Sequence, residues 1–203
     1  MTESEKMIAG EIYDPMDADI ADEQREALDL LYDYNATRPT ETAKRISLLE
    51  RMFAEIGENC YIEPPLRANF GGKHCHLGDS VYANFNLTLV DDGNIYIGSQ
   101  TMIGPNVTIA TAGHPILPEL RERGLQYNAD VHIGRNCWIG AGAVILPGVT
   151  ICDGTVIGAG SVVTRDIPEG CVAVGNPCRV LRAIGESDRE YFFKDRRIKW
   201  NLL

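Results

Sequence analysis

His114 is the side chain in this sequence that is best suited to acid–base chemistry. It lies in the segment Thr-Ala-Gly-His-Pro, where Gly113 frees the backbone and Pro115 restricts it. Imidazole titrates near neutrality, so a histidine here suits a general base that takes a proton from an alcohol. A solvated loop histidine without a chemical role fits the spacing equally well. The residues alone therefore leave both interpretations open.

Three further polar residues lie in a short stretch upstream of His114. Asn84, in the run Val-Tyr-Ala-Asn-Phe-Asn, is expected to point outward, where its amide could reach a ligand or make turn hydrogen bonds. Asp91 and Asp92 precede Gly93. They form either a turn or a carboxylate pair that accepts hydrogen bonds from hydroxyls.

A metal site is not expected. His74 and His76 flank Cys75, so both should alternate onto one outward face while Cys75 points inward. Zinc sites use at least three protein ligands, and no third ligand is apparent near this pair. We expect the two histidines to pack on the surface.

The charge of the chain restricts its partners. The formal net charge is −10 over 203 residues, so nucleic acid and anionic membrane surfaces would be repelled. We therefore expect no nucleic-acid or membrane partner. An anionic ligand would need a local group of basic side chains.

A cytoplasmic location is expected. The opening MTESEKMIAG is acidic and polar, without the apolar region of a signal peptide, and no apolar run reaches membrane-spanning length. The six cysteines include no Cys-x-x-Cys pair. Scattered cysteines of this kind are typical of reduced thiols in the cytosol.

A period of six residues determines how these side chains are positioned. Aliphatic residues recur at every sixth position, each with a small or aliphatic residue two places earlier. The aliphatic positions are Ile133, Ile139, Ile145, Ile151, Ile157 and Val163, with the same spacing at Ile97, Ile103 and Ile109 and a looser one at Leu77, Ala83 and Leu89. Neither an amphipathic helix nor a strand meander has this period.

The period predicts a parallel β-helix whose coils have three short faces. Side chains alternate along each short strand, so the aliphatic residue and the one two places before it point inward. Stacked coils then bury a continuous apolar column. A β-sandwich would have to keep this spacing by coincidence, because its strands follow no fixed period.

Apolar residues also occupy outward positions. Three hexads make one coil, so residues 18 apart share a face: Trp138 should stack near Val156, and Val144 near Val162. Outward apolar rows on a soluble protein mark an interface or a ligand groove. We expect at least one of these two faces to be covered by a neighbouring subunit.

Three regions follow along the chain. Residues 1–58 form an N-terminal lobe, with helical spacing at 19–35 and 40–56 and a stop at Gly57. Residues 59–184 form the β-helix, interrupted at 110–130 by a long loop. Residues 185–203 form a tail in which Ser187 begins a short helix through Phe193.

Longer motifs carry a resemblance to a known family. They are YANFNLTLVDD (82–92), TAGHP (111–115), CWIGAGAVILPGVTI (137–151), VIGAGSVVTRDIP (156–168) and VGNPCRV (174–180), with KMIAGEIYDP (6–15) and YFFKD (191–195) at the ends. In this combination the chain resembles the galactoside/maltose O-acetyltransferases over nearly its whole length. The resemblance implies a mainly β fold, a left-handed parallel β-helix with an N-terminal helical lobe and a short C-terminal helix and tail. It also implies a homotrimer with active sites between subunits.

The resemblance assigns roles on the acceptor side. His114 matches the catalytic base and Asn84 its partner near the reacting hydroxyl. Acceptor-contacting positions correspond to Tyr82, Asp92 and Asp17, with Asp14 as the alternative to Asp17, and Asn69 stands where the galactoside enzyme has a serine. That exchange leaves the identity of the acceptor open.

On the donor side the resemblance implies acetyl-CoA as co-substrate. The matching positions are Ala141, Ala159, Thr164, Arg165 and Arg179, with Arg182 in a position to assist. Ala141 replaces a serine whose backbone amide is the useful group. Arginines just past the repeats also make independent sense, because the phosphates of CoA need cationic donors on an acidic protein.

We therefore expect a sugar O-acetyltransferase that uses direct attack on the thioester with a histidine base. The acceptor would be a galactoside, maltose or a glucose-type sugar. Three alternatives compete with this expectation. They are an acetyltransferase for a xenobiotic or amino-acid hydroxyl, a β-helical metalloenzyme that needs three histidine ligands, and a scaffold without catalysis, in which the His114 loop would have no purpose.

Overall fold

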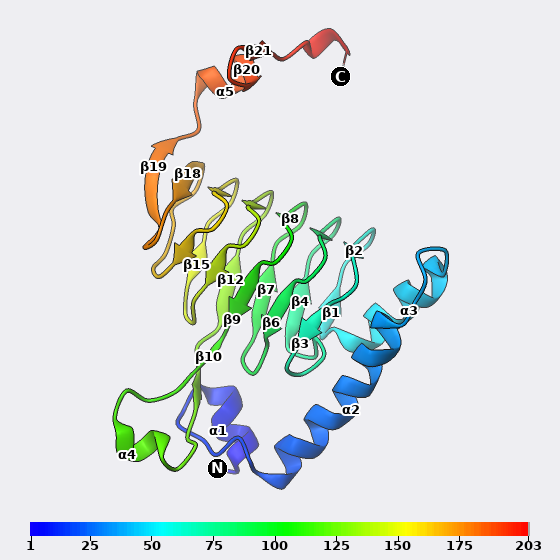
Figure 1. Ribbon diagram of the computed structural model, residues 1–203, viewed down its shortest axis with the longest axis vertical. Helices are drawn as coiled ribbons and strands as arrows, with labels where there is room; N and C mark the ends of the chain where they lie inside the picture. The colour runs from blue at the N-terminus through cyan, green and yellow to red at the C-terminus, as the bar shows by residue number, and fades with distance from the viewer. Residues whose placement is uncertain (203) are drawn as a thin grey trace.

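The computed structural model describes residues 1–202 and shows a three-sided parallel β-helix with helices at one end and a tail at the other (Figure 1). Each coil contributes one short strand to each of three faces. The predicted parallel β-helix is confirmed. Along the chain, each coil forms face 1, then face 2, then face 3.

Faces 1 and 3 are five-stranded and parallel, and face 2 is seven-stranded. Face 1 contains β1 (Glu55–Ile56), β4 (Cys75–Leu77), β7 (Ile95–Ile97), β12 (Val131–Ile133) and β15 (Thr150–Ile151). Face 2 contains β2 (Tyr61–Ile62), β5 (Tyr82–Ala83), β8 (Met102–Ile103), β13 (Trp138–Ile139), β16 (Val156–Ile157), β18 (Cys171–Val174) and the antiparallel β19 (Arg179–Ala183). Face 3 contains β3 (Arg67–Ala68), β6 (Thr88–Val90), β9 (Thr108–Ala110), β14 (Val144–Ile145) and β17 (Val162–Val163).

The six-residue period is the core of the protein. The aliphatic residues of the repeat, the looser ones included, are buried and belong to one apolar cluster. The outward neighbours also pair as predicted, since Trp138 lies opposite Val156 and Val144 opposite Val162. The period therefore fixes both what is buried and what lines each outer face.

The N-terminal lobe contains three helices, α1 (Glu3–Ala9), α2 (Ala18–Asn35) and α3 (Thr42–Met52). The sequence predicted only the last two. α1 was missed although Thr2 and Glu5 form a capping box at its start and Gly10 ends it. The helix predicted over 40–56 is too long, because α3 ends at Met52 and the chain then forms β1.

The interruption at 110–130 was predicted as a long loop, and that description was incomplete. β10 (Ala112–Gly113) and β11 (Tyr127–Asn128) pair as an antiparallel ribbon, and α4 (Pro118–Arg121) lies between them. Each strand of the ribbon has two residues, and the two strands are far apart in the sequence. Such short strands show no hydrophobic period from which they could be predicted.

The C-terminal tail also differs from its prediction. α5 covers Glu186–Glu190 and is followed by the hairpin of β20 (Tyr191–Phe193) and β21 (Arg196–Arg197) and by a 3₁₀ turn, η1 (Trp200–Leu202). Gly185, rather than Ser187, caps the helix, and its amide donates to Asp188. The tail extends away from the β-helix (Figure 1), and Leu203 lies outside the described residues.

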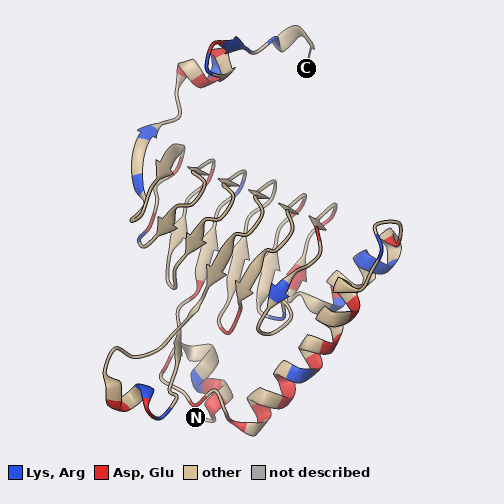
Figure 2. Cartoon of the chain, in the orientation of Figure 1, with Lys and Arg blue, Asp and Glu red and all other residues tan. Residues whose placement is uncertain are grey.

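Charge is unevenly distributed along the molecule. Acidic side chains follow α2, whereas β19 carries basic and no acidic side chains and the tail carries both (Figure 2). The basic group that an anionic ligand would require therefore lies at the C-terminal end of the β-helix. Among residues 1–202, no helix has the length and apolar character needed to cross a membrane.

Close contact between coils at the corners leads to a stability prediction. A Cβ added at Gly140 would lie 2.5 Å from the backbone nitrogen of Ala159 and 2.7 Å from the carbonyl oxygen of Ile157. We expect Gly140→Ala to lower the free energy of unfolding by about 1–3 kcal/mol, because the next coil must move. Gly185→Ala, with nothing within 4 Å of its added Cβ, is the control and should cost no more than the change of cap at the short α5, below about 1 kcal/mol. Urea denaturation measures both, and equal values would refute the prediction.

Candidate active site

His114 directly follows β10 of the β10–β11 ribbon, and a backbone carbonyl just before β11 holds its side chain. Its Nδ1 lies 2.9 Å from the carbonyl oxygen of Leu125, across the ribbon. A carbonyl accepts only, so Nδ1 carries the proton and Nε2 is left with its lone pair. The side chain is exposed, and no hydrogen bond to Nε2 occurs within residues 1–202. The imidazole thus presents a basic nitrogen to the outside.

Asp92 lies beside this ribbon in a polar cluster. Asn69 donates to one carboxylate oxygen at 2.9 Å, and Gln126 donates to the other at 2.8 Å. Gln126 also donates to the hydroxyl of Tyr13 at 2.5 Å, while its backbone pairs with that of Tyr13. Burial, with the charge of Asp92 adding, raises the pKa of Tyr13 well above its usual value. The N-terminal segment therefore braces the ribbon that carries His114.

Gln126 and Tyr13 were not found by sequence reasoning. Neither belongs to a hexad or to a motif with a chemical signature, and they are separated from Asp92 by long stretches of chain. Only the folded ribbon brings them together.

Asp91 and Asp92 have different surroundings. The sequence left open whether they form a turn or a carboxylate pair, and the two residues prove to differ. Asp91 is buried, and its oxygens accept from the amides of Phe70 and Gly72, both at 2.8 Å. Burial raises the pKa of Asp91, and the two amides act against this. Asp91 therefore holds a turn, and Asp92 is the carboxylate beside the ribbon.

Asp17 and Asp14 both make local hydrogen bonds. Asp17 caps α2 by accepting from the amide of Asp19 at 3.1 Å, and Asp14 accepts from the amide of Met16 at 2.9 Å. No hydrogen bond links either residue to Asp92 within the described chain. The choice between them stays a prediction.

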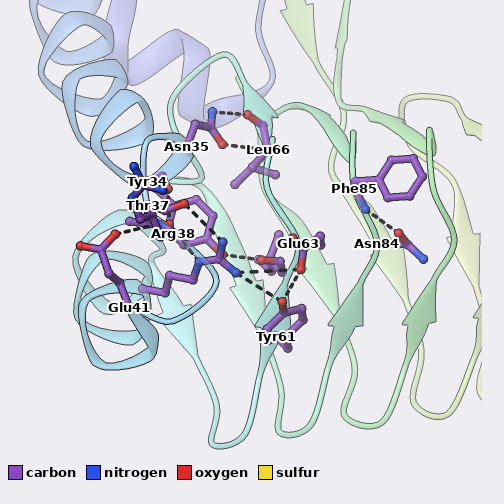
Figure 3. Close-up of polar contacts among 12 residues, drawn as sticks. Tyr34, Asn35, Thr37, Arg38, Glu41, Tyr61, Glu63, Leu66, Asn84 and Phe85 are labelled. Atoms are coloured by element: carbon purple, nitrogen blue, oxygen red, sulfur yellow. Dashed lines mark hydrogen bonds and ion pairs between the residues drawn. The ribbon is translucent and has the colours of Figure 1, made fainter.

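Tyr82 and Asn84 lie elsewhere, on face 2 and at the corner between faces 2 and 3. Tyr82 points outward from β5, and Asn84 follows that strand directly. The Asn84 side-chain oxygen accepts from the amide of Phe85 at 2.8 Å (Figure 3), so it has the turn role and its NH₂ group remains to donate. Ala141 and Ala159 follow later face 2 strands at the same corner, where the amide of Gly160 donates to the carbonyl of Ala141 at 2.9 Å.

The remaining predicted donor residues divide between two places. Arg179 and Arg182 lie on β19, the last strand of face 2, and Arg182 forms a two-pronged ion pair with Asp188 at 2.7 and 2.8 Å. Thr164 and Arg165 follow β17 and so lie at the corner between faces 3 and 1. Asn69, Asp92 and the His114 ribbon leave face 3 at that same corner.

The predicted site residues therefore form two groups on opposite sides of face 3. The first group, at face 2 and its corner, contains Tyr82, Asn84, Ala141, Ala159, Arg179 and Arg182. The second group contains Asn69, Asp92, His114, Thr164 and Arg165. A face 3 strand such as β9 separates them, and its three residues alone span about 10 Å. This is too far for Asn84 and His114 of one chain to hold one substrate atom.

The other histidines have packing roles. His74 donates from Nδ1 to the carbonyl of Asp91 (2.7 Å) and packs against Phe70, so it turns toward the corner. His76 stacks on Tyr96, which stacks on His132, along the outside of face 1. No group of three or more His, Cys, Asp or Glu side chains placed to hold a metal occurs among residues 1–202.

Comparison with known proteins identifies the family. The motif described as "Maltose acetyltransferase hexapeptide capping motif" matches residues 6–57, and "Bacterial transferase hexapeptide (six repeats)" matches residues 130–165. A galactoside O-acetyltransferase of Lactococcus lactis is 54% identical over 93% of this chain and 91% of its own length. The chain belongs to the galactoside/maltose O-acetyltransferase family.

Solved structures of this family have the same fold. A galactoside acetyltransferase in complex with coenzyme A has a TM-score of 0.95 at 45% identity, covering 98% of this chain and 99% of its own. A maltose O-acetyltransferase from Clostridium difficile has a TM-score of 0.89 at 44% identity, covering 92% and 99%. The chain is thus an O-acetyltransferase with the left-handed β-helix of hexapeptide repeats, an exception to the right-handed rule for parallel crossovers.

The different surroundings of the two aspartates lead to a prediction. In Asp91→Asn, the new NH₂ group would face a backbone N–H, and both donors would be buried without partners. We expect the free energy of unfolding to fall by about 2–4 kcal/mol. Asp153→Asn is the control, because Asp153 also accepts a backbone amide, that of Arg135 at 2.8 Å, but is exposed. It should cost less than about 1 kcal/mol in the same urea titration.

Proposed function

We propose that this protein transfers the acetyl group of acetyl-CoA to a hydroxyl of a galactoside, maltose or a glucose-type sugar. Two relatives described above are named a galactoside O-acetyltransferase and a maltose O-acetyltransferase, and these names support this substrate class. The coenzyme A complex of one of them supports the donor. The observation that carries the proposal is the pair of residue groups on either side of face 3. One holds the base together with Thr164 and Arg165, and the other holds the face 2 donor path, which Arg165 of a neighbouring copy would reach.

In the proposed mechanism His114 is the general base. Nε2 takes the proton of the sugar hydroxyl while that oxygen forms a bond to the thioester carbon. The tetrahedral intermediate collapses, the carbon–sulfur bond breaks, and the proton passes from Nε2 to the sulfur of CoA. The hydrogen bond from Nδ1 to the Leu125 carbonyl supports this role, because it fixes the tautomer and stabilises the imidazolium.

Hydrogen-bond donors at the corner between faces 2 and 3 would stabilise the oxyanion. The amide of Asn84 and the backbone N–H near Ala141 are the candidates. No acyl-enzyme is needed, and the inward cysteines support direct transfer. Burial raises the pKa of Cys75 and of Cys137, so both thiols stay protonated.

The outside of face 2 is the proposed path for CoA. Outward residues on successive strands lie opposite one another in one row: Tyr82, Met102, Trp138, Val156, Val172 and Arg182. At about 4.8 Å per strand, this row spans about 24 Å from Tyr82 to Arg182. An extended pantetheine arm can cover the apolar part of this row, from Met102 to Val172, with its phosphates at the basic end and its thioester toward the acceptor position at Tyr82.

The proposed assembly is a homotrimer whose sites lie between subunits. The base and the Asn84 corner are too far apart within one chain, but face 3 between them carries the outward Val144 and Val162. Face 3 would then face the assembly centre, where the His114 group of one copy meets the face 2 group of the next. A closed ring satisfies such unlike contacts without forming fibres.

The identity of the acceptor has two alternatives, a sugar hydroxyl and a hydroxyl of another compound. Asn69 and Gln126 both donate to Asp92, and other hydroxyl compounds could use the same polar cluster. A xenobiotic or amino-acid hydroxyl is therefore the alternative acceptor. Turnover with a panel of sugars, measured as CoA release, separates the two versions. The reaction as proposed needs no metal, and the six free thiols fit a cytoplasmic location.

Replacing the base tests the mechanism. We expect His114→Ala to lower kcat by about 10²–10⁴-fold, the usual contribution of one general base. The affinity for acetyl-CoA and the thermal midpoint should hardly change, because the side chain is exposed. Near-normal turnover at saturating substrates would rule the base out.

Subunit mixing tests whether the site is shared. His114→Ala and Asn84→Ala homotrimers should both be nearly inactive. Trimers that contain both kinds of chain should regain activity, because some sites then combine an intact His114 with an intact Asn84. No recovery in verified mixed trimers would contradict the shared site.

Arginine substitutions test the donor path. Arg179→Ala and Arg165→Ala should each raise the KM for acetyl-CoA by about tenfold or more, since a charge-assisted hydrogen bond contributes about 1.5–3 kcal/mol. The acceptor KM should stay nearly unchanged, and added salt should reduce the difference from wild type. Arg189→Ala is the control, because Arg189 is exposed in the tail, where its side chain pairs with Glu186 and its backbone carbonyl accepts from Trp200. A defect confined to the acceptor KM would remove these arginines from the donor path.

A further inference from the structure

The outward row on face 2 does not stop at Tyr82. It continues by one strand to Tyr61 on β2, which lies opposite Tyr82 in the register. The two rings are nearly parallel, with centroids 6.0 Å apart and an angle of 6° between their planes. Tyr61 is 42% exposed and Tyr82 39% exposed. The row of exposed side chains thus continues with a second aromatic residue one strand past Tyr82, on the side away from Arg182.

Tyr61 is exposed but held in place. Its hydroxyl donates to the carboxylate of Glu63, and Nη1 of Arg45 lies 3.3 Å from that hydroxyl and 3.9 Å from Glu63 (Figure 3). Arg45 is buried and is itself fixed by the hydroxyl of Thr37, at 2.9 Å from Nε. The hydrogen bond to Glu63 raises the pKa of Tyr61, so the hydroxyl stays protonated at neutral pH.

This arrangement does more than attach α3 to the first coil. An ion pair between Arg45 and Glu63 alone would make that attachment, and the hydroxyl of Thr37 already fixes Arg45. The network adds a fixed orientation for an exposed ring. A ring that is already ordered loses little entropy when a ligand covers it. Glu63 is only partly buried and keeps acceptor capacity for a ligand hydroxyl.

We propose that Tyr61 and Glu63, held by Arg45, form a subsite for a second sugar ring of the acceptor. The inference rests on the proposed sugar acetyltransfer at Tyr82 and Asn84. The reacting ring would lie at Tyr82, and the next ring would place its apolar C–H face on Tyr61. A hydroxyl of that ring would donate to Glu63. The acceptors that use this subsite are therefore disaccharides or longer glycans, while one-ring sugars occupy only the position at Tyr82.

The row itself favours this occupant over a second protein chain. Successive strands are about 4.8 Å apart, close to the length of one sugar ring, so neighbouring rings of a glycan can follow neighbouring aromatic side chains. Polar and apolar groups alternate at the subsite, with Glu63 and the tyrosine hydroxyls beside the ring faces. Such a mixture suits a sugar, whose faces are apolar and whose edges are polar.

Substituting Tyr61 tests the subsite with matched acceptors. For Tyr61→Ala we expect kcat/KM to fall about tenfold for maltose and to stay within about twofold for glucose. The same contrast should hold for lactose against methyl galactoside. Tyr61→Phe keeps the ring but loses its anchor, so its loss for maltose should be smaller, about two- to threefold. Thermal midpoints of the variants show whether folding is unchanged.

The outcomes separate the subsite from the function beneath it. Equal losses for one-ring and two-ring acceptors, or no loss, would overturn the subsite while wild-type sugar acetylation still stands. Failure of the wild type to acetylate any sugar would overturn both. Calorimetric binding of maltose to the His114→Ala protein with and without Tyr61→Ala repeats the comparison without turnover. If the two proteins bound maltose with equal affinity, that result would also refute the subsite.

Discussion

The backbone hydrogen bonds between successive coils are the constraint on which this structure depends. They hold each short strand opposite the equivalent strand of the next coil, and they are possible only if the corners pass each other closely. At Gly140 there is no room even for a methyl group. The inward aliphatic column fills the space that this stacking encloses. Once the stacking is set, the outward residues form straight rows, so chemistry can be distributed along a face.

Rows and corners explain how a simple repeat can carry a catalytic site. Face 2 provides a continuous row from Tyr61 to Arg182, suited to ligands laid end to end. The corner after face 3 can accept insertions, because a corner loop there does not enter the strand stacking. The ribbon with His114 is such an insertion, and it is braced by Tyr13 and Gln126 rather than by the repeat. The regular part thus supplies length, and the irregular part carries the proposed base.

Sequence reasoning succeeded where one physical period determined the answer. The β-helix, its buried positions and the pairing of Trp138 with Val156 all follow from the spacing of six. It failed where contacts join distant segments or short elements. α1, the β10–β11 ribbon and the β20–β21 hairpin have no period to reveal them, and Gln126 reaches Asp92 only through the folded ribbon. The family resemblance named the candidate site residues, but their division into two groups could be seen only once the three faces were known.

The two ends of the β-helix have different closures. A parallel stack exposes unpaired backbone groups at its first and last strands, where another chain could add itself. At the start, α2 and α3 pack against the first coil. At the finish, β19 reverses direction, and its exposed surface carries Arg179 and Arg182. Charged side chains on an edge strand discourage further strands from pairing with it. The arginines proposed to attract CoA phosphates would thus have a second effect, because their charges disfavour pairing of another strand with that edge.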